Sequence, residues 1–225
     1  MKKLALFDID GVIYEGHSIF DLVQSWEKDG LIDAGLWEHF LSLLGSYKKG
    51  ELTYKAAADS MLLEYSKKLS GKKYEDLVKA TYDFISYNKI KLFPYFEKLT
   101  PILKETHDIY FVTTNFDFTA EAFYKYFNVS GFLSSKINQN NGIINEGIEL
   151  SLGGNKGIVV DLINKYGFNG SIAVGDSEND ADMLEKVEHP FVIEPDEKLK
   201  IIATERNWTI VDRNNISDTI IKHAK

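Results

Sequence analysis

The 225-residue sequence contains no cysteine, only four prolines and only two arginines. Without cysteine, disulfides and thiolate metal sites are excluded. No apolar run approaches the ~20 residues of a membrane span, and the apolar segment before Asp8 is shorter than the ~7 residues that a secretory signal needs. The formal net charge of −8 disfavours nucleic acid as a partner. We therefore expect a soluble, cytoplasmic protein that binds neither nucleic acid nor membrane.

Two kinds of hydrophobic pattern divide the chain. The apolar run at 3–8 has the length of a strand buried in a parallel sheet. From about residue 18 to residue 88, four apolar stripes at helical spacing are typical of a small helical bundle. Beyond Phe93, strand-like segments alternate with helical patterns, which favours a parallel sheet. The strand-like segments are 108–113, 171–175 and 191–193, the helix candidates lie near 118–127, 156–166 and 178–187, and 132–150 is typical of a β-hairpin.

The order of these patterns predicts an insertion. One strand precedes the helical stretch and the other strands follow it. We expect an α/β core with a Rossmann-like parallel sheet at 1–13 and 93–225, and an inserted α-helical bundle, or cap, at 14–92. A bundle inserted there would lie over the carboxyl end of the first strand, where open α/β sheets bind ligands.

Two aspartates close the first predicted strand. Asp8 and Asp10 are two residues apart, so their side chains face the same side of a strand. Carboxylates placed in this way repel each other unless a cation lies between them or one of them holds a proton. Gly11 then allows a sharp turn. Considered alone, this motif is better explained by a solvated turn.

A second acidic cluster follows the predicted strand at 171–175. It contains Asp176, Asp180 and Asp182, with Glu178 and Asn179 between them. An EF-hand loop that began at Asp176 would need Gly and Glu where Ala181 and Val187 stand, so a calcium loop of this kind is excluded. Acidic residues are also favoured at helix starts, but that preference accounts for only one or two of them.

Two further positions suit phosphate binding. Thr113 ends a predicted strand, where its hydroxyl can donate to a phosphate oxygen. Lys156 opens a predicted helix after Gly153 and Gly154 and can hold a phosphate as a point charge. A P-loop is excluded because Gly157, not Ser or Thr, follows the lysine. A threonine or a lysine of this kind is weak evidence by itself.

Taken in order, these motifs resemble the haloacid dehalogenase-like (HAD) hydrolase superfamily. The ordered set is Asp-x-Asp after the first strand, Thr113 after a later one, Lys156 at a helix start, and Gly-Asp-x-x-x-Asp at 175–180. The helical insertion, the short hairpin and the stretch 170–212 are similar to the phosphoserine-phosphatase-like branch.

The resemblance implies roles for particular residues. Asp8 would be the nucleophile that forms an aspartyl-phosphate, and Asp10 would protonate the leaving oxygen and then deprotonate water. The implied Mg²⁺ ligands are Asp8, Asp10 (through its main-chain carbonyl) and Asp176, with Asp180 orienting the metal shell and Lys156. The implied phosphate-binding residues are Thr113, Thr114, Lys156 and Asn179.

The second aspartate narrows the implied reaction. Family members that attack carbon lack an acid at the Asp10 position, so the resemblance implies hydrolysis of a small phosphorylated metabolite. We expect the protein to be a monomer or a homodimer. Phosphoserine phosphatases use an arginine in the cap, whereas both arginines here, Arg206 and Arg213, lie far beyond it. Phosphoserine hydrolysis and phosphotransfer remain alternatives within the family, and a phospho-accepting, receiver-like signalling module or a scaffold with a vestigial site are alternatives outside it.

Overall fold

A central parallel strand, β1 (Lys3–Phe7), organises the sheet. The computed structural model describes residues 2–224, so the ends of the predicted core segments, Met1 and Lys225, lie outside the described residues. The seven-stranded sheet has the order β4-β3-β2-β1-β5-β6-β7, and only the β3–β4 pair is antiparallel. The other strands are β2 (His107–Phe116), β3 (Gly131–Asn140), β4 (Ile143–Leu150), β5 (Ile172–Gly175), β6 (His189–Ile193) and β7 (Thr209–Val211).

Strand β1 is apolar on both faces because helices cover both sides of the sheet. Ala5 and Phe7 pack in one hydrophobic cluster, and Leu4 and Leu6 pack in the other. The first cluster includes residues of α5 (Pro94–Thr106), α6 (Asp117–Phe127) and α10 (Ile216–Ala224). The second includes residues of the 3-10 turn η2 (Lys156–Val159), α8 (Ala181–Leu184) and α9 (Glu197–Glu205), with α7 (Val160–Tyr166) packed against it.

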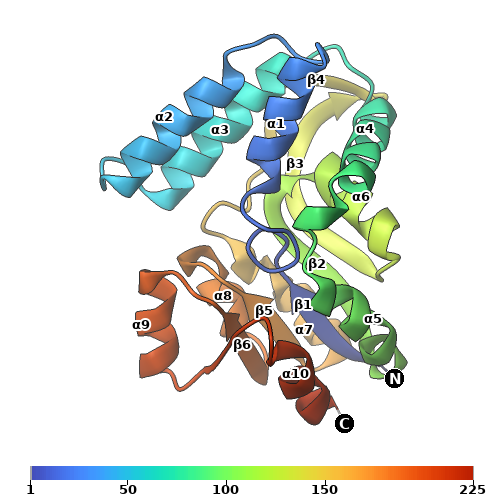
Figure 1. Ribbon diagram of the computed structural model, residues 1–225, viewed down its shortest axis with the longest axis vertical. Coiled ribbons are helices and arrows are strands. Elements are labelled where there is room, and N and C mark those ends of the chain that lie inside the picture. The colour runs from blue at the N-terminus through green and yellow to red at the C-terminus, as the bar shows by residue number, and fades with distance from the viewer. Residues whose placement is uncertain (1, 225) are drawn as a thin grey trace.

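Four helices lie between β1 and α5 and make up the insertion (Figure 1). They are α1 (Ser18–Lys28), α2 (Leu36–Lys48), α3 (Tyr54–Leu69) and α4 (Tyr74–Tyr87), followed by the 3-10 turn η1 (Lys89–Lys91). Trp26, Phe40 and Tyr65 join α1, α2 and α3, with ring centroids 6.0 Å apart for Trp26–Tyr65 and 6.2 Å apart for Phe40–Tyr65. The predicted fold class, an α/β core with an inserted helical cap, is confirmed, whereas the domain limits at residues 13 and 93 stay a prediction.

The base of the inserted helices is hydrogen-bonded to the β3–β4 hairpin. The Tyr74 amide donates to the Gly142 carbonyl at 2.8 Å, and the Ile144 amide donates to the Lys72 carbonyl at 2.9 Å. Helix α4 packs against α6, and α3 packs against β4. Figure 1 shows α2 and α3 extending side by side beyond the sheet, so the cap is anchored at one end and reaches over the carboxyl end of β1.

Local structure differs from expectation at two places near that edge. Strand β2 does not end at Thr113 but continues to Phe116, because β3 keeps pairing with it through a register irregularity between these two residues. The helix expected at 178–187 is a 3-10 turn, η3 (Glu178–Asp180), followed by the single turn α8. A capping box between Ser177 and Asp180 closes the start of this turn.

Within residues 2–224, no helix combines the length and the apolar character that crossing a bilayer demands.

Candidate active site

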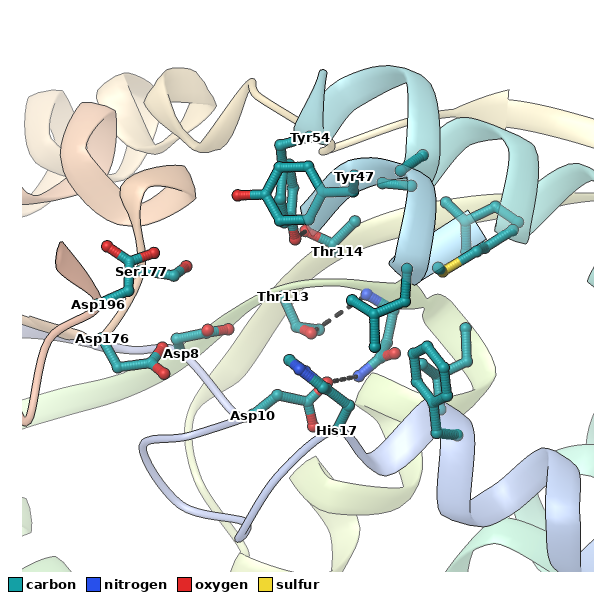
Figure 2. A pocket seen from close by; sticks show the side chains of 18 of the residues that line it. Asp8, Asp10, His17, Tyr47, Tyr54, Thr113, Thr114, Asp176, Ser177 and Asp196 are labelled. Carbon is teal, nitrogen blue, oxygen red and sulfur yellow. Dashed lines mark hydrogen bonds between the residues drawn. The ribbon is translucent and has the colours of Figure 1, made fainter. Parts of the chain in front are cut away.

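The candidate site lies where two neighbouring parallel strands end. Asp8 follows β1 and Asp176 follows β5, and the Asp8 amide donates to the Val174 carbonyl at 3.0 Å. Oxygens of Asp8, Asp176 and Asp180 all lie within 4.8 Å of one another. Figure 2 shows the carboxylates of Asp8 and Asp176 side by side. The sheet therefore brings together acids that are far apart in the sequence.

Lys156 is the buried cation of this cluster. Its Nζ lies 2.7 Å from Asp8 Oδ1 and 2.6 Å from Asp180 Oδ1, and the residue is only 1% exposed. Burial lowers the pKa of Lys156, but the carboxylates of Asp180 and Asp8 raise it more, so its pKa lies above the ordinary value. The ammonium is therefore charged at every physiological pH and neutralises part of the acidic cluster.

Asp180 is held by the backbone as well as by Lys156. Its Oδ2 accepts hydrogen bonds from the amides of Asp176 and Ser177, each at 3.0 Å. Its other oxygen bonds Lys156, and the residue is fully buried. Asp180 therefore fixes the positions of Lys156 and of the loop that carries Asp176.

One lysine does not balance three carboxylates. Burial raises the pKa of Asp8 to about 7; Lys156 opposes the rise, and the nearby Asp180 and Asp10 charges add to it. Burial also raises the pKa of Asp176 well above its ordinary value, as do the Asp180 and Asp8 carboxylates. A cluster of this kind binds a proton or a further cation readily. Its donors are all oxygens, which are the ligands that Mg²⁺ prefers.

The Asp10 side chain stands apart from that cluster. Its Oδ1 accepts from the Ser18 amide at 2.8 Å, at the start of α1, and its Oδ2 accepts from Asn115 Nδ2 at 3.2 Å. Figure 2 places Asp10 beside His17, on the cap side of Asp8. The structure thus groups Asp8, Asp176 and Asp180 but leaves the Asp10 carboxylate outside the group.

The predicted phosphate-binding residues are brought to the same edge in different ways. Thr113 and Thr114 line the cavity beside Asp8. Asn179 does not line it: its Oδ1 accepts from the Gly154 amide at 2.6 Å, and its Nδ2 donates to Thr114 Oγ1 at 3.1 Å. With both ends of its amide engaged, Asn179 joins the loop that precedes Lys156 to β2.

The site opens into a cavity of about 340 Å³ that is lined by the core on one side and by α1, α2 and α3 on the other. Ligand pockets range over about 300–1,000 Å³, so this cavity has room for one small molecule.

Sequence reasoning missed the residues that hold Asp10, and two tyrosines of the cap also line the cavity. Asn115 and Ser18 hold Asp10 and bond each other, with Asn115 Nδ2 donating to Ser18 Oγ at 3.0 Å. Tyr54 places its hydroxyl 3.3 Å from Thr114 Oγ1, and Tyr47 also lines the cavity. Only the polar Thr-Thr-Asn run at the end of β2 signals any of these contacts in the sequence.

Comparison with known proteins identifies the family. A family model described as haloacid dehalogenase-like hydrolase matches residues 2–188, so this chain belongs to the haloacid dehalogenase-like hydrolases. No protein with a curated description matches it.

Solved structures with the same fold agree with that assignment. A protein of unknown function from Bordetella pertussis Tohama I is 24% identical, with a TM-score of 0.76, and the match covers 95% of this chain and 99% of that one. A phospho-aspartyl intermediate analogue of phosphoserine phosphatase is 18% identical, with a TM-score of 0.65 and 94% and 93% coverage. A phosphoserine phosphohydrolase-like protein from Francisella tularensis is 16% identical, with a TM-score of 0.66 and 96% and 98% coverage. At these identities the similarity establishes a shared fold.

Proposed function

We propose that this protein is a Mg²⁺-dependent phosphatase that hydrolyses a small phosphomonoester through an aspartyl-phosphate on Asp8. The observation that carries the proposal is the arrangement of buried Asp8 and Lys156 beside half-buried Asp176 at the end of the cavity. Nearby positive charge is what a carboxylate needs in order to approach a dianionic phosphate.

The first half of the reaction transfers the phosphoryl group to the protein. An oxygen of the Asp8 carboxylate attacks phosphorus while the bond from phosphorus to the ester oxygen breaks. Protonated Asp10 gives its proton to that oxygen, and the alcohol leaves. The hydrogen bonds from Ser18 and Asn115 support this role because they hold the Asp10 carboxyl in one orientation.

The second half releases phosphate. The Asp10 carboxylate now takes a proton from water, the water oxygen bonds to phosphorus, and the bond to the Asp8 oxygen breaks. A positioned general acid and base of this kind contributes about 10²–10⁴-fold to a rate. After the two halves together, Asp8 is again a free carboxylate and Asp10 is again protonated.

Phosphate oxygens would contact Lys156 Nζ and the hydroxyls of Thr113 and Thr114, which line the same end of the cavity. Asp8, Asp176 and the Asp10 main-chain carbonyl would hold Mg²⁺, and Asp180 would orient this group without direct contact. When bound, the ion supplies positive charge to the phosphoryl oxygens.

Phosphate release from 4-nitrophenyl phosphate tests the proposal. We expect turnover with Mg²⁺, none with excess EDTA, and none from Asp8→Asn. Asp33→Asn is the matched control, because Asp33 is an exposed acid outside the cavity. Undiminished turnover by Asp8→Asn would refute the covalent route.

A receiver-like signalling role is the alternative from another class. It predicts a long-lived phosphorylated Asp8 with no phosphate release. The cavity argues for turnover, because it encloses Asp8 together with Asp10, a second carboxyl that can act on both the leaving group and water.

A further inference from the structure

The cavity continues beyond the phosphate end into an apolar wall that belongs to the cap. Ile19 and Phe20 come from α1, Leu44 from α2, and Met61 and Leu62 from α3. On α3 the lining residues recur at the three- and four-residue spacing of one helix face. The part of a substrate that lies farthest from phosphorus therefore meets hydrocarbon.

The side chains of this wall pack closely against their neighbours. Phe20 packs edge-on against Phe40, with ring centroids 5.5 Å apart at 65°. Met61 and Leu62 are only 9% and 2% exposed. Side chains held by such packing lose little freedom on contact with a ligand, which favours apolar recognition at this wall.

The charges around the cavity disfavour an anionic leaving group. Within the described residues, four carboxylates line it, from Asp8, Asp10, Asp176 and Asp196. Two ammonium groups line it: Lys156 is already paired with Asp8 and Asp180, and Lys48 is exposed.

A substrate carboxylate would therefore find no buried cation that is free of a carboxylate partner. An unpaired charge that is buried against hydrocarbon is strongly destabilised. Neither arginine is part of the lining in the chain as described. The cavity thus lacks the guanidinium that would hold a carboxylate with two parallel hydrogen bonds.

We propose that the substrates are phosphomonoesters of uncharged, apolar alcohols, with a ring or branched alkyl body packed against Phe20, Leu44 and Met61. This inference rests on the proposed phosphatase function. It assigns the cap a specificity site that selects against amino-acid and other anionic phosphates.

Four alkyl phosphates test the inference: methyl phosphate, benzyl phosphate, phosphoserine and phosphoethanolamine. All are esters of simple alcohols, so differences in kcat/KM report recognition more than the reactivity of the ester. We expect benzyl phosphate to exceed both phosphoserine and phosphoethanolamine by at least ~10-fold, the lower end of what one apolar contact contributes to discrimination.

Substitutions on α3 test whether Met61 causes the preference for an apolar leaving group. Met61→Ala should lower the ratio of kcat/KM for benzyl phosphate to kcat/KM for methyl phosphate by several-fold. Met61→Leu, which keeps the apolar volume, should leave this ratio unchanged. Leu63→Ala is the matched control, since Leu63 is on the same helix but does not line the cavity and is 38% exposed. Thermal unfolding of each variant checks that it folds.

The outcomes separate this inference from the proposed function. If phosphoserine or phosphoethanolamine is the best substrate, or if Met61→Ala leaves the ratio unchanged, the apolar specificity site is refuted and the phosphatase stands. If none of the four esters nor 4-nitrophenyl phosphate releases phosphate, the phosphatase itself is refuted.

Discussion

Replacing Gly11 with alanine tests how closely the turn after Asp10 is fitted to the acidic cluster. Gly11 has φ +75°, and a Cβ added there would lie 2.5 Å from Asp176 Cγ and overlap its carboxylate oxygens. The Asp176 side chain would have to move away from Gly11, which displaces one carboxylate of the acidic cluster. Gly16 is the matched control, since it has φ +80° and nothing within 4 Å of an added Cβ.

The two variants share the backbone strain and differ in the overlap. A non-glycine residue in the left-handed region costs about 1–2 kcal/mol. For a chain of this size, each kcal/mol corresponds to a Tm change of about 2–4 °C. Gly16→Ala should therefore lose some thermal stability and keep its Mg²⁺ requirement.

Gly11→Ala should also lose thermal stability. In addition, it should need at least ~10-fold more Mg²⁺ for half-maximal activity, because disturbing the groups that orient metal ligands weakens metal binding by at least about that factor. The assay is phosphate release against Mg²⁺ concentration. Equal Mg²⁺ requirements for Gly11→Ala and Gly16→Ala would refute the placement of Asp176 beside the turn.

Three further predictions concern individual charges. Asp10→Asn should lower kcat by about 10²–10⁴-fold, measured by steady-state phosphate release, and equal kcat would contradict its proton-transfer role. Lys156→Met leaves Asp8 and Asp180 without their buried cation. In EDTA, its free energy of unfolding in urea titrations should therefore fall by about 3–5 kcal/mol. An unchanged urea midpoint would contradict a stabilising role for the ion pair. Burial raises the pKa of Asp117 from 3.8 to about 6, so the native state binds a proton on this carboxyl more tightly than the unfolded chain does. The free energy of unfolding therefore falls by roughly 3 kcal/mol as the pH rises through that range. Asp117→Asn keeps an Oδ1 for the amides of Phe118 and Ile137. Its stability relative to the unsubstituted protein should therefore increase as the pH rises from about 4 to about 7.5. If the stability difference between the two proteins does not change with pH, Asp117 is excluded as the source of the pH dependence.

The sequence predicted those parts of the fold that depend on local pattern. The run before Asp8 is apolar at every position, which only a strand covered on both faces explains, and β1 is the central strand. The hairpin was predictable because Asn141 and Gly142 suit the positive φ values, 50° and 76°, that a tight turn needs. The clustering of Asp8 with Asp176 followed from the rule that carboxyl ends of parallel strands share one edge.

The parts that could not be predicted depend on contacts between distant segments. Asn115 ends a polar Thr-Thr-Asn run, but nothing local shows that it bonds Asp10, 105 positions away in the chain. Helix α4 has the same periodic pattern as α1 to α3, and only the structure shows that it packs against α6. The orientation of the Asp10 carboxyl likewise depends on where α1 begins, which periodicity predicts only to within a few residues.

Chemical trapping of the proposed intermediate tests the account most directly. Because 4-nitrophenolate leaves without a proton, Asp10→Asn should slow phosphate release from the protein more than it slows formation of the intermediate from 4-nitrophenyl phosphate. Acid quenching of this variant with Mg²⁺ and 4-nitrophenyl phosphate should therefore retain about one phosphoryl group per chain. Mass spectrometry of the peptide that contains Asp8 should then show that group on the Asp8 side chain, with none in Asp8→Asn. Phosphate release without any phosphorylated Asp8, or a phosphoryl group on another residue, would contradict the account.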